Sequence, residues 1–432
     1  MEATEVLILV FSFVIFIAIG VPIAYCIGIA GVITMLLSID YLPAVTTFAQ
    51  RMATGLNSFT LLAIPLFILA GQLMNTGGIA SRLIEFAKVL VGRLPGGLAV
   101  VNVLANMLFG AISGSAGAAA SAIGTIMHPR MKNEGYDENF SAAVNITSAT
   151  TGLVIPPSNI LIIYSLASGG VSIAALFLAG YLPGVLTGLA LIGFATAYAY
   201  RHNYPTGEKV PLREGVQKFL AALPSLLLLI IILGGIVAGV FTATEASGVA
   251  VLYCLALAFI YREIKVSDLP DILIRTTLTT CIVLLMVAAS IGLSWVMAYE
   301  EIPQNVSAAL LTLSDSPFLI LLIINIILLF VGVFMDMTPA VLIFTPIFLP
   351  VVTQQLGIDP VHFGIILIVN LCVGLCTPPV GTVLFIGCSV ANIKIQSVVK
   401  PLLPFFVAMV VVLLLVTYIP EISLWLPRQF GF

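Results

Sequence analysis

Long apolar runs separated by short polar stretches make up most of this chain. They predict helices at about residues 5–21, 22–39 and 57–75, a helix lying along the membrane surface at 80–94, and a full span at 172–200. A bilayer core takes about 20 apolar residues per helix, so the runs give room for roughly ten to twelve membrane elements, some of half length. The pattern therefore predicts an all-α integral membrane protein with an uncleaved first helix.

Two proline pairs interrupt the apolar runs. Pro156-Pro157 falls within the run 140–167, and Pro378-Pro379 falls within 363–391. Proline donates no amide hydrogen and moves the preceding residue out of the helical region, so a helix must end and another must begin at each pair. In hydrocarbon, such a break survives only where the backbone faces protein, water or a bound ion. We therefore expect two broken helices.

Two further runs have the length of helical hairpins. They span 98–128, with a turn near Ser113-Gly114-Ser115, and 318–352, with a turn near Asp336. Their arms of about 15 residues are too short for two full crossings, which predicts re-entrant hairpins whose tips stop inside the membrane.

The positions of prolines and glycines in the second half of the chain repeat those of the first half at an offset of about 222 residues; Pro378 falls on Pro156 and Gly332 on Gly110. We expect one repeat at 1–200, a cytoplasmic linker at 201–218 and a second repeat at 219–432, which includes a surface helix at 303–313. An inverted arrangement places all but Arg51 and Arg428 of the 16 basic residues on one face. Basic loops favour the cytoplasm, so this predicts an inverted repeat with both termini in the periplasm.

Composition excludes several classes of protein. Hydrophobic residues make up 61% of the chain and charged residues only 8%, which is far from the usual composition of a soluble protein. The six cysteines lie in apolar segments without metal-ligand spacing, and no phosphate-binding loop is present. Without a catalytic constellation, we expect no enzyme, no organic cofactor and no nucleic-acid partner.

Each tip and its neighbouring break combine small residues, hydroxyls and free carbonyls. Such oxygens suit a hard monovalent cation, so two or more sodium sites are expected. The alternatives are ordinary small-residue helix packing at the first tip and a merely solvated Asp336 at the second. The candidate sodium ligands are Ser113 and Ser115 with Gly152, Val154, Ile155 and Pro156, and Gly332, Asp336 and Thr338 with Gly374, Cys376 and Thr377.

An anionic solute would meet few cations here, because no Lys or Arg occurs in 133–200 or 276–393. Thr377 is expected to cap a half-helix that begins at the second break, and helix N-termini attract anions. Glu245 is expected to cap its own helix, and His128, His202 and His362 to lie in loops. The candidate substrate-binding residues are Ser115, Ser158, Asn159, Thr338 and Thr377.

Several short segments together resemble the large membrane subunit of the TRAP (tripartite ATP-independent periplasmic) transporters, over nearly the whole chain. One departure is Ala243, where the family more often has proline. The segments are Asn57-Ser58-Phe59, Ile64-Pro65-Leu66-Phe67, Ser113-Gly114-Ser115, Ile155-Pro156-Pro157-Ser158, Phe241-Thr242-Ala243-Thr244-Glu245-Ala246 and Thr377-Pro378-Pro379-Val380-Gly381.

The resemblance implies a fold similar to the divalent-anion sodium symporters, with a scaffold and a mobile transport domain that works as an elevator. It also implies sodium coupling, a bacterial inner-membrane location, a small four-helix membrane subunit and a periplasmic substrate-binding protein. The implied substrate is an acidic organic solute, of the sialic acid type or a C4-dicarboxylate, and the chain is most similar to the sialic acid members. The alternatives are a stand-alone sodium/anion symporter and, from another class, a channel or a structural membrane protein.

Overall fold

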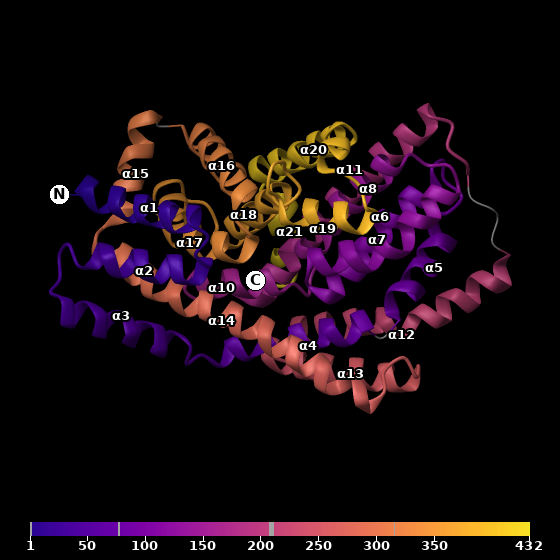
Figure 1. The fold of residues 1–432 in the computed structure, drawn as a ribbon, viewed down its shortest axis with the longest axis horizontal. Coiled ribbons are helices and arrows are strands. Elements are labelled where there is room, and N and C mark those ends of the chain that lie inside the picture. The colour runs from indigo at the N-terminus through magenta and orange to yellow at the C-terminus, as the bar shows by residue number, and fades with distance from the viewer. Residues whose placement is uncertain (1, 77, 207–210, 315) are drawn as a thin grey trace.

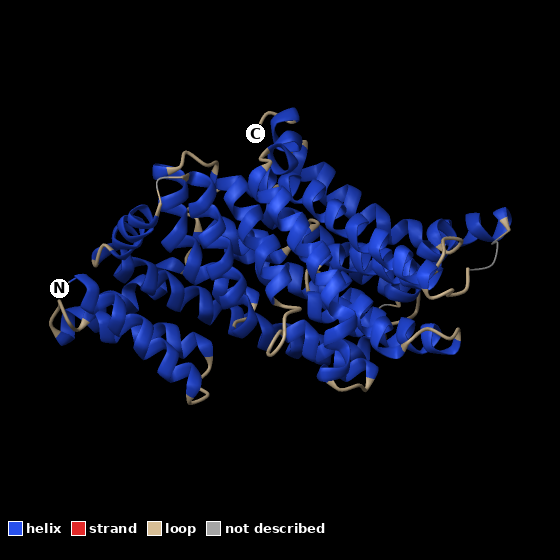
Figure 2. Cartoon of the chain, turned by 90° about the horizontal axis from the view of Figure 1, so that it is seen from above, coloured by secondary structure: helices blue, strands red, loops and turns tan. Residues whose placement is uncertain are grey.

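The computed structural model describes residues 2–76, 78–206, 211–314 and 316–432, with backbone alone at 2, 3 and 212. The described residues form helices joined by short loops (Figure 2). The first half contains α1 (Glu2–Ala18), α2 (Ile23–Met35), α3 (Tyr41–Gly55), the 3₁₀ turn η1 (Phe59–Leu62), α4 (Ala63–Thr76), α5 (Ile79–Val91), α6 (Gly97–Ser113), α7 (Ala116–Asn133), α8 (Glu138–Ala149), α9 (Thr151–Val154), α10 (Asn159–Ala167) and α11 (Ile173–Arg201).

The second half contains α12 (Leu212–Val237), α13 (Ala243–Ile260), the turn η2 (Val266–Asp268), α14 (Leu269–Tyr299), α15 (Ile302–Leu313), α16 (Pro317–Phe334), α17 (Met337–Pro350), the π-helical turn η3 (Val351–Gln355), α18 (Pro360–Gly374), α19 (Thr382–Ala391), α20 (Ile395–Tyr418) and α21 (Glu421–Gln429).

Among the described residues, 8 helices are long and apolar enough to cross a membrane, or 9 if the bent pair formed by α8–α9 and α10 counts as one span. That pair is bent by 52° at the first proline break. The chain is therefore a multi-pass membrane protein.

Two helices, α3 and α21, were not predicted from the apolar runs of the sequence. α3 buries only Ala44 and Phe48, and Phe48 packs close to Gly31 of α2 and Gly292 of α14. α21 buries Ser423, Leu424 and Pro427 and packs against α11. Part of the expected linker, residues 207–210, lies outside the described residues, and α12 begins at Leu212 within it.

The expectation that all three histidines lie in loops is wrong for two of them. His128 lies within α7 and His362 within α18, and both are buried. Their Nδ1 atoms lie 3.2 Å from Ser141 Oγ and 2.6 Å from Ser423 Oγ, respectively. His202 is exposed, directly after α11. The two buried rings are therefore packed structural groups hydrogen-bonded to serines.

The helices form two groups (Figure 1). α2, α3, α4, α13 and α14 pack on one another along one side of the molecule, while the hairpins α6–α7 and α16–α17 lie on the other side with α8, α18 and α19. The groups meet where α14 contacts α17 and where α4 contacts α6 and α10. The candidate site lies at this junction.

Several features recur 222 residues apart, the spacing that also separates Cys372 from Thr150. α8 and α18 begin at Glu138 and Pro360, and α11 and α20 begin at Ile173 and Ile395. Each proline pair has a cis peptide bond, at Pro156-Pro157 and at Pro378-Pro379. The starts of these helices and the proline pairs therefore recur at the same spacing in the structure as in the sequence.

The repeated features include two close helix crossings. A Cβ built on Gly152 would lie 2.2 Å from the Cα of Gly110, and one built on Gly374 would lie 2.6 Å from the Cα of Gly332. Backbone therefore touches backbone, and only glycine fits. Each crossing fixes a hairpin arm against the helix that breaks beside it.

Ion pairs fasten α5 to its neighbours. Glu85 pairs with Arg130 of α7 at 2.8 Å and with Lys218 of α12 at 3.1 Å. Burial alone would raise the pKa of the Glu85 carboxyl, but the hydrogen bonds from Arg130 and Lys218 outweigh it and hold this pKa below its ordinary value. Glu85 therefore links a hairpin arm to a helix of the opposite half of the chain.

Candidate functional site

A cavity of about 470 Å³ lies between the two hairpin tips. Its polar lining comes from both tips, from the starts of α10 and α19, and from the facing surfaces of α4 and α14. The lining side chains with polar groups are Gln72, Asn75, Ser113, Ser115, Asn159, Thr279, Asp336, Thr338 and Thr382. A volume of this size is within the range of small-molecule sites.

The first tip is a tight turn between α6 and α7. Gly114 has a left-handed conformation with φ of 62° and ends α6, which is why a residue without a Cβ stands there. Ser115 begins α7 by accepting a hydrogen bond from the Ala118 amide at 3.2 Å. Ser113 is buried, and its hydroxyl has no hydrogen-bond partner among the described residues. An unpaired buried hydroxyl is costly, so Ser113 fits a site that a ligand completes.

The second tip joins α16 to α17 through an extended Met335. Asp336 precedes α17 without capping it, is exposed toward the cavity, and accepts a hydrogen bond from the Thr382 hydroxyl at 3.2 Å. Thr382 is the first residue of α19. This bond ties the second tip to the half-helix that follows the second break.

Asp336 is the one charged side chain among the described residues that line the cavity, and no Lys or Arg lines it there. An anion in this cavity would be held by hydroxyls and amides, with the Asp336 carboxylate needing a cation beside it. Hydroxyl and carboxylate oxygens are hard ligands, and they fit a sodium ion.

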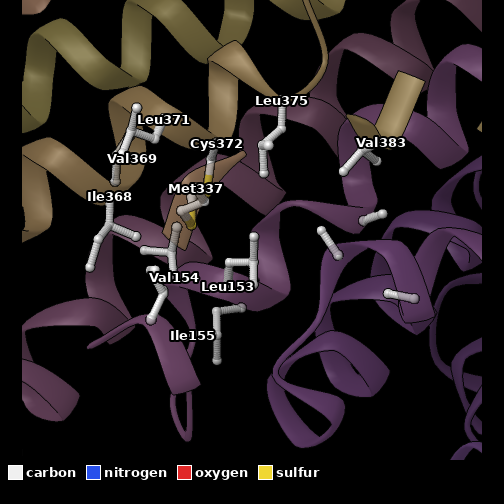
Figure 3. Packing of buried hydrophobic residues seen from close by; sticks show 14 of the residues in the cluster. Leu153, Val154, Ile155, Met337, Ile368, Val369, Leu371, Cys372, Leu375 and Val383 are labelled. Carbon is white, nitrogen blue, oxygen red and sulfur yellow. The ribbon is translucent and has the colours of Figure 1, made fainter. Parts of the chain in front are cut away.

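The breaks contribute one residue each to the cavity wall, Leu153 and Leu375. Figure 3 shows both in the same packed region as Met337 of the second tip. The Leu153 carbonyl already accepts a hydrogen bond from the Ser158 hydroxyl at 2.6 Å, and the Leu375 carbonyl accepts one from the Leu384 amide at 3.4 Å.

Other residues proposed from the sequence lie behind this wall. Gly152, Gly332 and Gly374 form the helix crossings, and the Cys376 thiol donates to the Ile146 carbonyl at 3.4 Å. A Cβ on Gly180 of α11 would lie 2.3 Å from the Val154 carbonyl oxygen, so that oxygen faces α11. Outside the cavity lining lie Gly152, Val154, Ile155, Pro156, Ser158, Gly332, Gly374, Cys376 and Thr377.

The expectation that Thr377 caps a half-helix is wrong. α19 begins five residues later, at Thr382, with Gly381 at the cap position. The Thr377 hydroxyl donates instead to the Val373 carbonyl at 2.8 Å, because the backbone after the proline pair turns once more before it becomes helical. Ser158 does precede α10, but its hydroxyl binds Leu153 and no amide of that helix. The expected cap at Glu245 is present, since Glu245 and Thr242 form a reciprocal capping box.

Four polar positions of the lining were not predicted from the sequence, namely Gln72 and Asn75 on α4, Thr279 on α14 and Thr382 on α19. Also not predicted was a hydrogen-bonded cluster behind the first tip, where the Asn106 amide donates to Asn145 Oδ1 at 3.1 Å and to Ser148 Oγ at 2.8 Å. Polar side chains inside apolar runs were the available signal.

Comparison with known proteins places the chain in a family. The family model described as "Tripartite ATP-independent periplasmic transporter, DctM component" matches residues 10–422. The chain is 58% identical over 426 residues to an uncharacterized protein of Salmonella typhimurium, covering 99% of this chain and 98% of that protein.

Two further relatives carry functional names. The chain is 41% identical to a C4-dicarboxylate TRAP transporter large permease of Pseudomonas aeruginosa, covering 94% of each protein. It is 40% identical to a sialic acid TRAP transporter large permease of Vibrio cholerae, covering 88% of this chain and 89% of that protein. These near-equal similarities favour neither solute.

A solved structure has a similar fold. The YdaH transporter of Alcanivorax borkumensis superposes with a TM-score of 0.67 at 13% identity, covering 92% of this chain and 90% of that one. At this identity the similarity concerns the fold alone.

Proposed function

This chain belongs to the DctM-component family of the tripartite ATP-independent periplasmic transporters, and we propose that it is the permease of a sodium-coupled importer of an acidic organic solute. Its relatives of known name are transporter permeases and not enzymes. The cavity between the hairpin tips supports this proposal most directly. Among the described residues, it brings together hydroxyls, the Asp336 carboxylate and helix starts from both halves of the chain.

Sodium ions bind beside the two tips. The unpaired hydroxyl of Ser113 and the Ser115 hydroxyl serve the first site, beside Leu153 of the break between Gly152 and Pro156. The Asp336 carboxylate and the Thr338 hydroxyl serve the second, beside Leu375 of the break between Gly374 and Thr377. Each bound cation offsets the missing Lys and Arg side chains and makes the cavity attractive to an anion.

The solute carboxylate binds between these sites, at Ser115, Asn159 and Thr338. Relatives of this chain are named for C4-dicarboxylates, sialic acid, isethionate and 2,3-diketo-L-gulonate, all of which are organic anions. The positive charge of sodium and the negative charge of the solute compensate each other in the cavity. Each ligand therefore binds more tightly when the other is present, which couples their binding.

The two groups of helices work as an elevator. α2, α3, α4, α13 and α14 form the fixed scaffold, and the two hairpins with the broken helices move against it as one body, linked by the arm helices α5 and α15. The recurrence at 222 residues, together with the one-sided distribution of basic residues, supports an inverted repeat.

The transporter includes two partners, a small four-helix membrane subunit on the scaffold and a periplasmic protein that delivers the solute. A relative in Oleidesulfovibrio alaskensis is named "Isethionate TRAP transporter permease protein DctMQ", and this chain matches only 65% of its length. The additional length of that relative supports a membrane partner. The location that follows is the bacterial inner membrane, with both termini periplasmic.

The test is solute uptake into vesicles that contain this chain and the proposed small membrane subunit, supplied with the proposed periplasmic substrate-binding protein. An inward sodium gradient should drive accumulation, and collapsing the gradient with a sodium ionophore should abolish it. Accumulation without the partners would point to a stand-alone symporter. Flux that only equilibrates the solute would point to a channel.

A further inference from the structure

A second cavity, of about 320 Å³, lies further along the same helices. α10, α14 and α17 line both cavities. On α14, Thr279 and Val283 line the main cavity and Ser290 and Ser294 line the second, which at 1.5 Å per residue puts the nearest pair about 10 Å apart along the axis. We call the second cavity the outer pocket, because it lies toward the end of α14 that bears Glu300, on the face that the charge pattern places outside.

The outer pocket contains the positive charge that the main cavity lacks. Arg51 of α3 lines it, with its guanidinium carbon 5.3 Å from the centre of the Trp295 ring. No described carboxylate lies within ion-pair distance of Arg51. A guanidinium stacked on an aromatic face keeps its N–H groups free along the edge, where they match the two oxygens of a carboxylate.

Two hydroxyls complete the arrangement. Ser290 and Ser294 lie one helical turn apart and both line the outer pocket. Ser290 is 3% exposed, and its Oγ has no hydrogen-bond partner among the described residues. A buried hydroxyl without a partner beside an arginine without a carboxylate indicates a place for an oxyanion.

We propose that the outer pocket is a receiving site for the carboxylate of the incoming organic acid, which Arg51, Ser290 and Ser294 bind before the acid reaches the cavity between the tips. This inference rests on the proposed function. A lipid phosphate offers the same oxyanion chemistry. We assign the carboxylate because the same three helices line this pocket and the main cavity, and because its volume is that of a small acid rather than of a diacyl lipid.

The fluorescence of Trp295, which lines the outer pocket, can report binding there. The chain has two tryptophans, and Trp425 lies on α21, so the Trp425→Phe variant leaves Trp295 as the single tryptophan, which is excited selectively at a wavelength that tyrosine does not absorb. This variant, in discs of neutral phosphatidylcholine, is titrated with succinate, N-acetylneuraminate, isethionate and 2,3-diketo-L-gulonate. We expect a saturable change in Trp295 fluorescence with at least one of these acids.

Arg51→Gln should raise the half-saturating acid concentration at least tenfold, and Ser290→Ala severalfold. The matched control is Arg275→Gln, which removes an exposed charge from the opposite end of α14 and should leave the titration unchanged. Ser290→Ala keeps the test decisive if Arg51→Gln does not fold, as judged by gel filtration.

Three results would overturn the inference. The first is no saturable response to any acid, and the second is a half-saturating acid concentration in both Arg51→Gln and Ser290→Ala that equals that of the Trp425→Phe parent. The third is a response that appears only when phosphatidylglycerol replaces part of the neutral lipid. Uptake by the unmodified transporter is measured in parallel. Sodium-driven uptake without a Trp295 response contradicts this site alone, whereas absent uptake contradicts the proposed function.

Discussion

The thiol of Cys372 donates a hydrogen bond to the carbonyl of Thr150, 3.4 Å away and 222 residues earlier in the chain. These two residues occupy corresponding places in the two broken helices. If the halves are related by a two-fold axis, a residue meets its own counterpart only where that axis passes. With such an axis, the contact would lie on it, with one glycine crossing and one hairpin tip on either side.

The glycine crossings should tolerate no side chain. Gly152→Ala would place a Cβ 2.2 Å from the Cα of Gly110, so the hairpin arm must move away from the broken helix. We expect the free energy of unfolding to fall by about 1–3 kcal/mol, the usual cost of overpacking. The fall would be seen as a lower thermal unfolding midpoint in detergent. Gly248→Ala, on α13 with nothing within 4 Å, is the control and should be neutral or stabilising; equal loss in both variants would contradict the packing described here.

Hydroxyl removal at the tips should weaken sodium binding without disrupting assembly. Ser115→Ala and Thr338→Ala each delete an oxygen that lines the cavity. We expect the sodium concentration for half-maximal uptake to rise roughly tenfold, which corresponds to about 1.4 kcal/mol. Thr125→Ala, whose hydroxyl binds the Ser121 carbonyl within α7, is the control. Unchanged sodium dependence of uptake in both tip variants would show that sodium binds at other residues.

The ion pairs of Glu85 should make stability depend on pH. The folded-state pKa of Glu85 lies below its ordinary value, so the pairs stabilise the protein above a pH of about 4.3, and the gain is lost as the pH falls through the lowered pKa. Glu85 is partly exposed, which limits the contribution to about 1 kcal/mol. Glu85→Gln should therefore lower the unfolding midpoint at pH 7, and the difference from the unmodified protein should shrink as the pH falls through the lowered pKa. The same pH profile in Glu134→Gln, an exposed control, would argue against this cause.

The sequence was sufficient to predict features that depend on local rules. The proline pairs located both breaks, and hydrophobic run lengths located α6, α7, α16 and α17 to within a few residues. The Thr377 cap was wrong because its prediction assumed that a helix follows a proline pair at once. α3 was missed because only Ala44 and Phe48 face inward, toward α2 and α14, and such packing is set by residues distant in sequence.

Part of the cavity lining was predicted for the same reason. Ser113, Ser115, Asp336 and Thr338 lie at turns that a sequence reveals, and all four line the cavity. Gln72 on α4 and Thr382, which binds Asp336, become part of it only when separate helices pack together. Long-range packing of this kind leaves no local pattern in the chain.

The central claim is that the cavity between the tips couples sodium to the solute through Asp336, its one charged side chain among the described residues. The most direct test is initial uptake at increasing sodium concentration in vesicles containing the complete transporter or its Asp336→Asn variant. We expect Asp336→Asn to raise the half-saturating sodium concentration at least tenfold, or to abolish sodium-driven uptake, while the complex still assembles. An assembled Asp336→Asn transporter with an unchanged sodium dependence would contradict this claim.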